Sequence, residues 1–343
     1  MDEKQAKYFL ITSCLLLFVF IFVLFISFFL TNNKCNDGAL NNRCSKIQPY
    51  FCENGKLIEK ASVCGCLKNN YGINYNIKED KCVFSSSNPK IISLNYILRG
   101  KKGNISFEVY PEILNLSLNY KYPIESGFDS SNFKLQIINN SIQREALLPL
   151  IIKIQNITSN KYDQARIAIS LVQNIPYKES NRSIFVAGSL MGYRRTPYEV
   201  LYENQGVCGE KSLLLVFLLK ELGFGSSMFY FSKENHEAVG IKCTKDMSFY
   251  DTDFCFIETT GPSIITDSEN DYLLGVKLSS NPQITLISEG ISFNKNLYEF
   301  KDARLFIKLR EELKKSSSLN IFDSLRLKNL IKKYGISNIY FSI

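Results

Sequence analysis

Hydrophobic positions change their spacing several times along the chain, and the first pattern is an uncharged run from Tyr8 to Leu30 that is apolar on every face. At about 1.5 Å per residue, such a helix can cross a hydrocarbon core about 30 Å thick. No small-residue cleavage pattern follows it, so an uncleaved signal anchor fits better than a removed signal peptide. We therefore expect residues 1–34 to form a short tail and a transmembrane anchor, with residues 8–30 in the lipid bilayer.

Alternating apolar positions follow a linker-like stretch at residues 83–90. Ile105, Phe107 and Val109 occupy every second position, and the run from Leu114 to Tyr120 alternates in the same way. Alternation of this kind is typical of half-buried strands. The sequence predicts a β-rich region over residues 91–145.

The spacing then becomes helical. Residues 143–157 carry apolar side chains at intervals of three and four, and a second helix is predicted from Asn160, as the capping residue, to about Gln173. Residues 178–205 resemble a loop. A third helix is predicted from Cys208 to Leu222, and because it is apolar nearly all round, we expect it to be deeply buried.

Short β-like runs follow this buried helix. They are Ser227–Ser232, His236–Cys243, Phe254–Glu258 and Ile284–Ile287. Two further helical patterns, Tyr298–Lys314 and Ile321–Lys333, fall within a C-terminal segment, residues 291–343. A helix followed by antiparallel strands is an α+β order.

Ten cysteines change the picture of the region after the anchor, because six of them lie between Cys35 and Cys82. Such density in a segment too small for a large core predicts disulfides and an oxidising compartment, with 15 pairings open. Zinc binding is the alternative, although no histidine lies nearby. We expect residues 35–90 to be a disulfide-rich segment with a linker. Cys243 and Cys255 flank the predicted hairpin, and a disulfide between them would leave Cys208 unpaired.

Charge adds little. The chain has 343 residues, 45% hydrophobic and 22% charged, with a net charge of +8. This composition is typical of a folded chain. The lysines near the C-terminus lie in helical patterns, as expected for solvated faces, and no aromatic-interleaved basic groove indicates nucleic acid.

The segment Gly206-Val-Cys208-Gly209 carries the candidate chemistry. A cysteine at the start of a buried helix faces the positive end of the helix dipole and unpaired N–H groups, which favour the nucleophilic thiolate. The same N–H groups can stabilise an oxyanion. A buried structural thiol is the alternative.

The thiolate needs a base, and His236 is the only histidine in the chain. Glu258 ends the next predicted strand, so a hairpin would place its carboxylate beside the imidazole as the orienting acceptor. Asp251 and Asp253 are rival acceptors in the hairpin loop. A core imidazole and an exposed glutamate at the strand end remain the alternatives for His236 and Glu258.

These motifs resemble the transglutaminase-like superfamily, which shares a papain-like core. The resemblance rests on Gly206–Cys208, Asn235–Ala238 and Glu258–Thr260, where the family usually has aspartate in place of Glu258. It covers about residues 145–290, and it implies a transglutaminase-like domain over 146–290 with the cysteine helix packed on an antiparallel sheet. It also fits a mostly archaeal, membrane-anchored branch with a Cys-rich stretch.

The resemblance implies acyl transfer from a peptide or amide carbonyl through a Cys208 thioester, to water or to an amine, with Cys208, His236 and Glu258 as catalytic residues. We expect a single-pass protein of the cell membrane whose main domain is extracytoplasmic and acts on a peptide or protein substrate. No metal and no cofactor are expected. The alternative is a catalytically inactive cell-surface binding module with the same fold.

Overall fold

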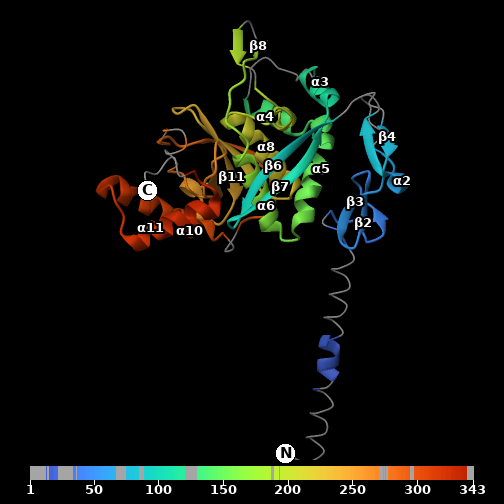
Figure 1. Ribbon diagram of the computed structural model, residues 1–343, viewed down its shortest axis with the longest axis horizontal. Coiled ribbons are helices and arrows are strands. Elements are labelled where there is room, and N and C mark those ends of the chain that lie inside the picture. The colour runs from blue at the N-terminus through green and yellow to red at the C-terminus, as the bar shows by residue number, and fades with distance from the viewer. Residues whose placement is uncertain are drawn as a thin grey trace, which may run out of the picture. The chain divides into compact units, whose positions relative to one another are not determined.

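The computed structural model describes residues 13, 15–21, 34–35, 37–66, 75–84, 89–119, 130–186, 189–192, 194–269, 273, 275, 277–293 and 297–337. The chain divides into two compact units, Met1–Ser86 and Ser87–Ile343 (Figure 1). Most of the predicted anchor at residues 8–30 lies outside the described residues. Among the residues that are described, no helix combines the length and the apolar character needed to span a membrane.

The first unit is small and covalently cross-linked. Strands β1 (Arg43–Cys44), β2 (Tyr50–Glu53) and β3 (Lys56–Glu59) form one antiparallel sheet. Helix α2 (Ala61–Cys64) and the hairpin of β4 (Tyr75–Lys78) and β5 (Lys81–Phe84) complete it. The six cysteines pair as Cys35–Cys52, Cys44–Cys64 and Cys66–Cys82. The predicted disulfide framework is therefore confirmed, and these thiols are not zinc ligands.

The second unit begins with a long hairpin, β6 (Lys90–Leu98) and β7 (Lys101–Val109), which buries Ile105, Phe107 and Val109 as predicted. The strand predicted from Leu114 to Tyr120 is wrong, because Pro111–Asn119 forms helix α3. Ile113 and Ser117, one helical turn apart, are its buried positions. Helix α4 (Ser130–Ile138) follows, so the region 91–145 is β only in its first part.

Two helices then support the centre of this unit. Helix α5 (Ser141–Ile157) and helix α6 (Lys161–Gln173) match the predicted patterns, and the Asn160 side chain accepts the Asp163 N–H as a cap. The loop predicted at residues 178–205 is wrong in part. It contains the short hairpin β8 (Ser183–Val186) and β9 (Ser189–Gly192) and helix α7 (Pro197–Glu203).

Helix α8 (Cys208–Glu221) occupies the core, as its uniformly apolar sequence predicts. It contacts α6 and α7 as well as strands β10 (Ser226–Phe231) and β11 (His236–Lys242). Gly223, with a φ of 89°, follows the helix in the left-handed region, where a residue without Cβ is favoured.

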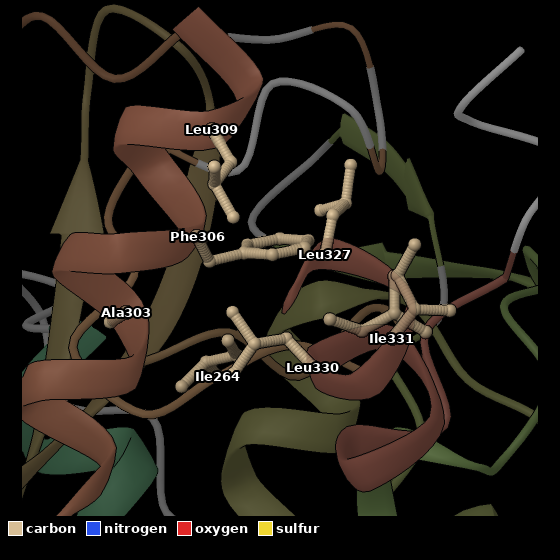
Figure 2. Packing of buried hydrophobic residues seen from close by; sticks show 8 residues of the cluster. Ile264, Ala303, Phe306, Leu309, Leu327, Leu330 and Ile331 are labelled. Atoms are coloured by element: carbon tan, nitrogen blue, oxygen red, sulfur yellow. The ribbon is translucent and has the colours of Figure 1, made fainter. Parts of the chain in front are cut away.

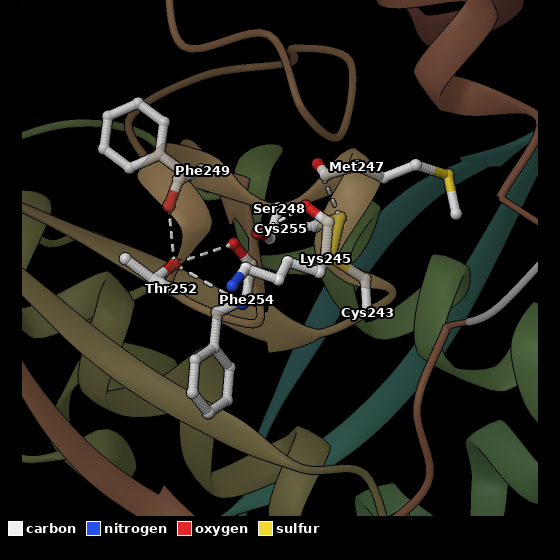
Figure 3. The surroundings of a disulfide bond; sticks show 8 residues. All are labelled: Cys243, Lys245, Met247, Ser248, Phe249, Thr252, Phe254 and Cys255. Atoms are coloured by element: carbon white, nitrogen blue, oxygen red, sulfur yellow. Dashed lines mark hydrogen bonds between the residues drawn. A yellow bond between two sulfur atoms is a disulfide. The ribbon is translucent and has the colours of Figure 1, made fainter.

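Four antiparallel strands form the sheet beside α8, in the order β12–β11–β10–β13. Strand β12 (Phe254–Ile257) and strand β13 (Gln283–Ser288) are its edges. At the base of the turn that joins β11 to β12, Cys243 and Cys255 form the predicted disulfide (Figure 3). Hydrogen bonds within this turn, such as Thr252 Oγ1 to Phe249 O at 2.6 Å, organise it further. The unit is thus of the α+β class.

Helices α10 (Glu299–Ser316) and α11 (Ile321–Tyr334) end the described chain, close to the predicted boundaries. Their apolar faces meet in one cluster, in which Phe306 of α10 lies against Leu327 of α11 and Ile264 of the loop after β12 (Figure 2). The C-terminal helices are therefore packed into the second unit and not appended to it.

Candidate active site

Cys208 is the first residue of α8 and, of the cysteines that the structure describes, the one that is free. The residue before the helix is Val207, whose side chain offers no hydrogen-bond acceptor to the first-turn N–H groups. The start of the helix is fixed instead by Glu210, which accepts the Val207 N–H at 3.0 Å and pairs with buried Arg195 at 2.9 Å. A half-buried thiol therefore lies at the helix start, beside the N–H groups of the first turn.

The imidazole comes from the neighbouring strand. His236 begins β11, is 5% exposed, and its Nε2 lies 2.8 Å from Glu258 Oε2. The Cys208 side chain interacts with the same ring and favours its protonated form. The structure thus brings together the three residues that the sequence predicted as a site.

The charge state of His236 follows from these two partners. Burial alone lowers the pKa of His236, but the hydrogen bonds to Cys208 and Glu258 and their negative charge outweigh it and raise the pKa to about 10. The ring is therefore an imidazolium at neutral pH, able to give a proton to a leaving group.

Glu258 is held as a carboxylate. It follows β12 directly and is 2% exposed. Its Oε1 accepts the N–H groups of Thr259 and Thr260 at 2.8 and 3.0 Å and the Thr260 hydroxyl at 2.9 Å. Burial raises the pKa of Glu258, but the bond to His236, the imidazolium charge and the Thr260 donors hold it below its usual range. One oxygen is thus fixed by the backbone while the other orients the ring.

Neighbouring polar side chains fasten these elements to one another. The Thr259 hydroxyl lies 3.3 Å from the Cys208 carbonyl and 3.1 Å from the Ser212 hydroxyl. Gln173, at the end of α6, donates its side-chain amide to the Glu258 carbonyl at 2.9 Å. The buried helix and the sheet are therefore bridged at the site itself.

The rival acceptors do not serve this role, since the carboxylate that meets His236 is that of Glu258. Asp251 lies in the 3₁₀ turn Phe249–Asp251 and Asp253 just after it. Gln205, three residues before Cys208, gives its side-chain amide to Glu203 at 3.2 Å.

Sequence reasoning missed four charged side chains around the site. Lys211 lies one turn into α8 and is fully buried. Glu237, next to His236, pairs with Lys134 at 2.5 Å and Arg194 at 3.0 Å. A Cβ at Gly209 would lie 1.8 Å from Glu237 Oε2, so only glycine fits beside this carboxylate. The Cys-x-x-Lys spacing was a usable signal for Lys211, whereas the partners of Glu237 come from distant segments.

No group of three or more His, Cys, Asp or Glu side chains that could hold a metal ion occurs within the described ranges. The chain also matches no protein family model and no curated protein. Among solved structures it is similar to calcium-bound LapG of Legionella pneumophila, with 13% identity and a TM-score of 0.28, over 57% of this chain and 96% of LapG. The functional proposal therefore rests on the geometry of the three residues above.

Proposed function

We propose that the chain is a cysteine enzyme of the transglutaminase-like, papain-type group, which transfers the acyl group of a peptide or amide through a thioester on Cys208. The observation that carries the proposal is the convergence of Cys208, His236 and Glu258 from a helix start and two strand ends, with His236 Nε2 2.8 Å from Glu258 Oε2 and Cys208 acting on the same ring. A nucleophile, a proton carrier and an orienting carboxylate in this order are what acyl transfer requires.

In the first half of the reaction, the Cys208 sulfur attacks the carbonyl carbon and the carbonyl oxygen takes up negative charge. The N–H groups at the start of α8 stabilise that oxygen. As the tetrahedral species collapses, the carbon–nitrogen bond breaks and His236 gives its proton to the departing amine. Cys208 is left as a thioester and His236 as a neutral imidazole.

In the second half, water or an amine attacks the thioester carbon, and neutral His236 takes up the proton of this nucleophile. The carbon–sulfur bond then breaks, which restores the thiolate and the imidazolium. Water yields hydrolysis, as in a peptidase or amidase, and an amine yields transamidation. Glu258 keeps the ring in one orientation throughout, since its other oxygen is fixed by Thr259 and Thr260.

We further propose that the chain is a single-pass protein of the cell membrane with its two folded units outside the cytoplasm. The apolar run at residues 8–30 and the disulfides of both units support this location. The membrane-anchored, mostly archaeal branch of the resemblance fits the same arrangement.

Thiol labelling of the full-length chain tests the enzyme proposal. Wild type and Cys208→Ser are treated with iodoacetamide between pH 5 and 9, and labelling is mapped by mass spectrometry, because Cys14 is a second thiol in the sequence. We expect rapid labelling at Cys208 even at pH 5–6, where an ordinary thiol is protonated. Labelling that follows an ordinary thiol profile would favour a non-catalytic binding module. Incubation of wild type with a peptide library, with and without added amine, then separates hydrolysis from transamidation.

A further inference from the structure

Lys211 is an unusual feature of α8, because its side chain is 0% exposed. Its ammonium group donates to three backbone carbonyls, those of Ile175 at 2.6 Å, Thr260 at 3.2 Å and Gln173 at 3.4 Å. These oxygens are neutral and cannot balance a positive charge. Buried lysines are rare unless a negative charge stands nearby.

The negative charges that act on Lys211 belong to the candidate site. They are those of Glu258 and Cys208. Burial lowers the pKa of Lys211 to about 7, and these two charges oppose that shift by favouring the protonated lysine. Lys211 is three residues after Cys208 on the same helix, so the two side chains lie on neighbouring positions of its surface. The ammonium group also binds the carbonyl of Thr260, two residues after Glu258.

The charge balance of the site shows what this lysine contributes. Glu258 is a buried carboxylate, and a reactive Cys208–His236 pair consists of one anion and one cation. Without Lys211 the cluster would therefore carry a net negative charge away from water, which is unfavourable. Protonating the Cys208 thiolate would relieve that charge but would remove the nucleophile. With Lys211 protonated, the cluster is neutral and the thiolate can persist.

Other titratable groups face the same region from several elements. Glu210 of α8 is engaged by Arg195, Glu237 of β11 is paired with Lys134 and Arg194, and Tyr177 precedes α7 in the chain. Burial is the main reason that the pKa of Tyr177 is raised, so it stays uncharged at neutral pH. The groups whose charges determine the balance are therefore Cys208, His236, Glu258 and Lys211.

We propose that Lys211 is a positioning residue that offsets the buried charge of Glu258 and thereby allows Cys208 and His236 to coexist as thiolate and imidazolium. This inference rests on the function proposed for that pair. It assigns Lys211 no contact with substrate, since the lysine acts through the charge state of Cys208.

The test compares the pH dependence of Cys208 alkylation by iodoacetamide in the full-length chain and in Lys211→Met, which keeps the length of the side chain and removes its charge. We expect the midpoint of alkylation to rise by about one pH unit, equivalent to about tenfold slower labelling below the midpoint. Lys220→Met is the matched control, since Lys220 lies in the last turn of the same helix and binds Asn139 and Glu221. Its midpoint should equal that of wild type.

Lys211→Gln provides a second variant, because its amide can still donate to the surrounding carbonyls while the charge is absent. A raised midpoint in either variant, with Lys220→Met unchanged, supports the inference. An unchanged midpoint together with a smaller amount of folded protein means that Lys211 only ties backbone segments together. Failure of both variants to fold leads to the same conclusion. Each of these results overturns the inference. A wild-type Cys208 that titrates as an ordinary thiol overturns the proposed function instead, so the two failures are distinct.

Discussion

Replacing Glu258 by glutamine should lower the pKa of His236 without removing the side chain that orients it. Glutamine is nearly the same size, and its amide oxygen can still accept the N–H groups of Thr259 and Thr260. The substitution removes the negative charge 2.8 Å from His236 Nε2. With the amide oxygen held by these two N–H groups, the amide nitrogen takes the position of Oε2, so the substitution removes both the charge and the acceptor that face the ring.

The magnitude follows from the nature of the lost bond. A hydrogen bond to a charged group contributes about 1.5–3 kcal/mol, and one pKa unit corresponds to about 1.36 kcal/mol. The pKa of His236, which its two partners raise to about 10, should fall by about one to two units in Glu258→Gln. The remaining elevation comes from Cys208.

The assay is unusually direct because His236 is the only histidine. Full-length protein labelled with ¹³C at histidine Cε1 gives one imidazole resonance, and its chemical shift against pH yields the midpoint. Asp251→Asn is the matched control, since it makes the same chemical change at an exposed carboxylate in the 3₁₀ turn Phe249–Asp251, and its midpoint should equal that of wild type. A wild-type midpoint near 6.5, or no decrease in Glu258→Gln, would refute the ion-pair reasoning.

Three further outcomes are expected. The raised pKa of His236 stabilises the folded chain fully below pH 6.5, and this stabilisation is lost as pH rises toward 10. Burial lowers the pKa of Lys211 to about 7, so the free-energy cost of burying its positive charge is relieved above that pH. Lys211→Met should therefore reveal a free energy of unfolding in urea that falls by about 1.4 kcal/mol per pH unit between about pH 8.5, above which an unfolded cysteine is ionised as well, and about pH 10, and a flat profile there would contradict this. Replacing both Cys243 and Cys255 by serine should cost about 3 kcal/mol in the same assay, for a loop with a sequence separation of 12; no loss would show that the turn is rigid without the bond. Phe306→Ala should lower the free energy of unfolding by about 3–5 kcal/mol. Ile321→Ala, at a residue 72% exposed, should change the free energy of unfolding by less than about 0.5 kcal/mol. Equal effects would argue against the packing between α10 and α11.

Periodicity predicted the helix and strands that build the site, because each of these elements has at least one strongly apolar face. Helix α8 is apolar all round, and its start at Cys208 agrees with the structure. The hairpin that joins His236 to Glu258 was predicted for the same reason. The local sequence pattern is enough to predict an element whose residues are uniformly buried.

Periodicity failed in α3 because a coincidence of spacing hid the helix. Leu114, Leu116 and Leu118 alternate, yet Leu118 is exposed, and the buried side is set by contacts of α3 with α5 and α7. Proline at position 111 begins this helix, and proline is favoured in a first helical turn. Tertiary contacts outweighed the apparent strand pattern.

Helix α7 was missed although its signal is in the sequence. Thr196 caps it, Pro197 is its first residue, and the Glu199 carboxylate accepts the Thr196 N–H at 2.7 Å. A threonine followed three residues later by glutamate is a recognised helix start. The partners of Arg195 and Glu237, in contrast, come from other segments, and local sequence carries no signal for them.

The disulfide between Cys243 and Cys255 closes the turn at the far end of the strands from His236 and Glu258. Insertions or deletions between the two cysteines should therefore leave the spacing of imidazole and carboxylate unchanged. In relatives of this chain we expect that stretch to vary in length more freely than any other part of the sheet. The same property makes it a suitable place to insert an affinity tag or a reporter peptide.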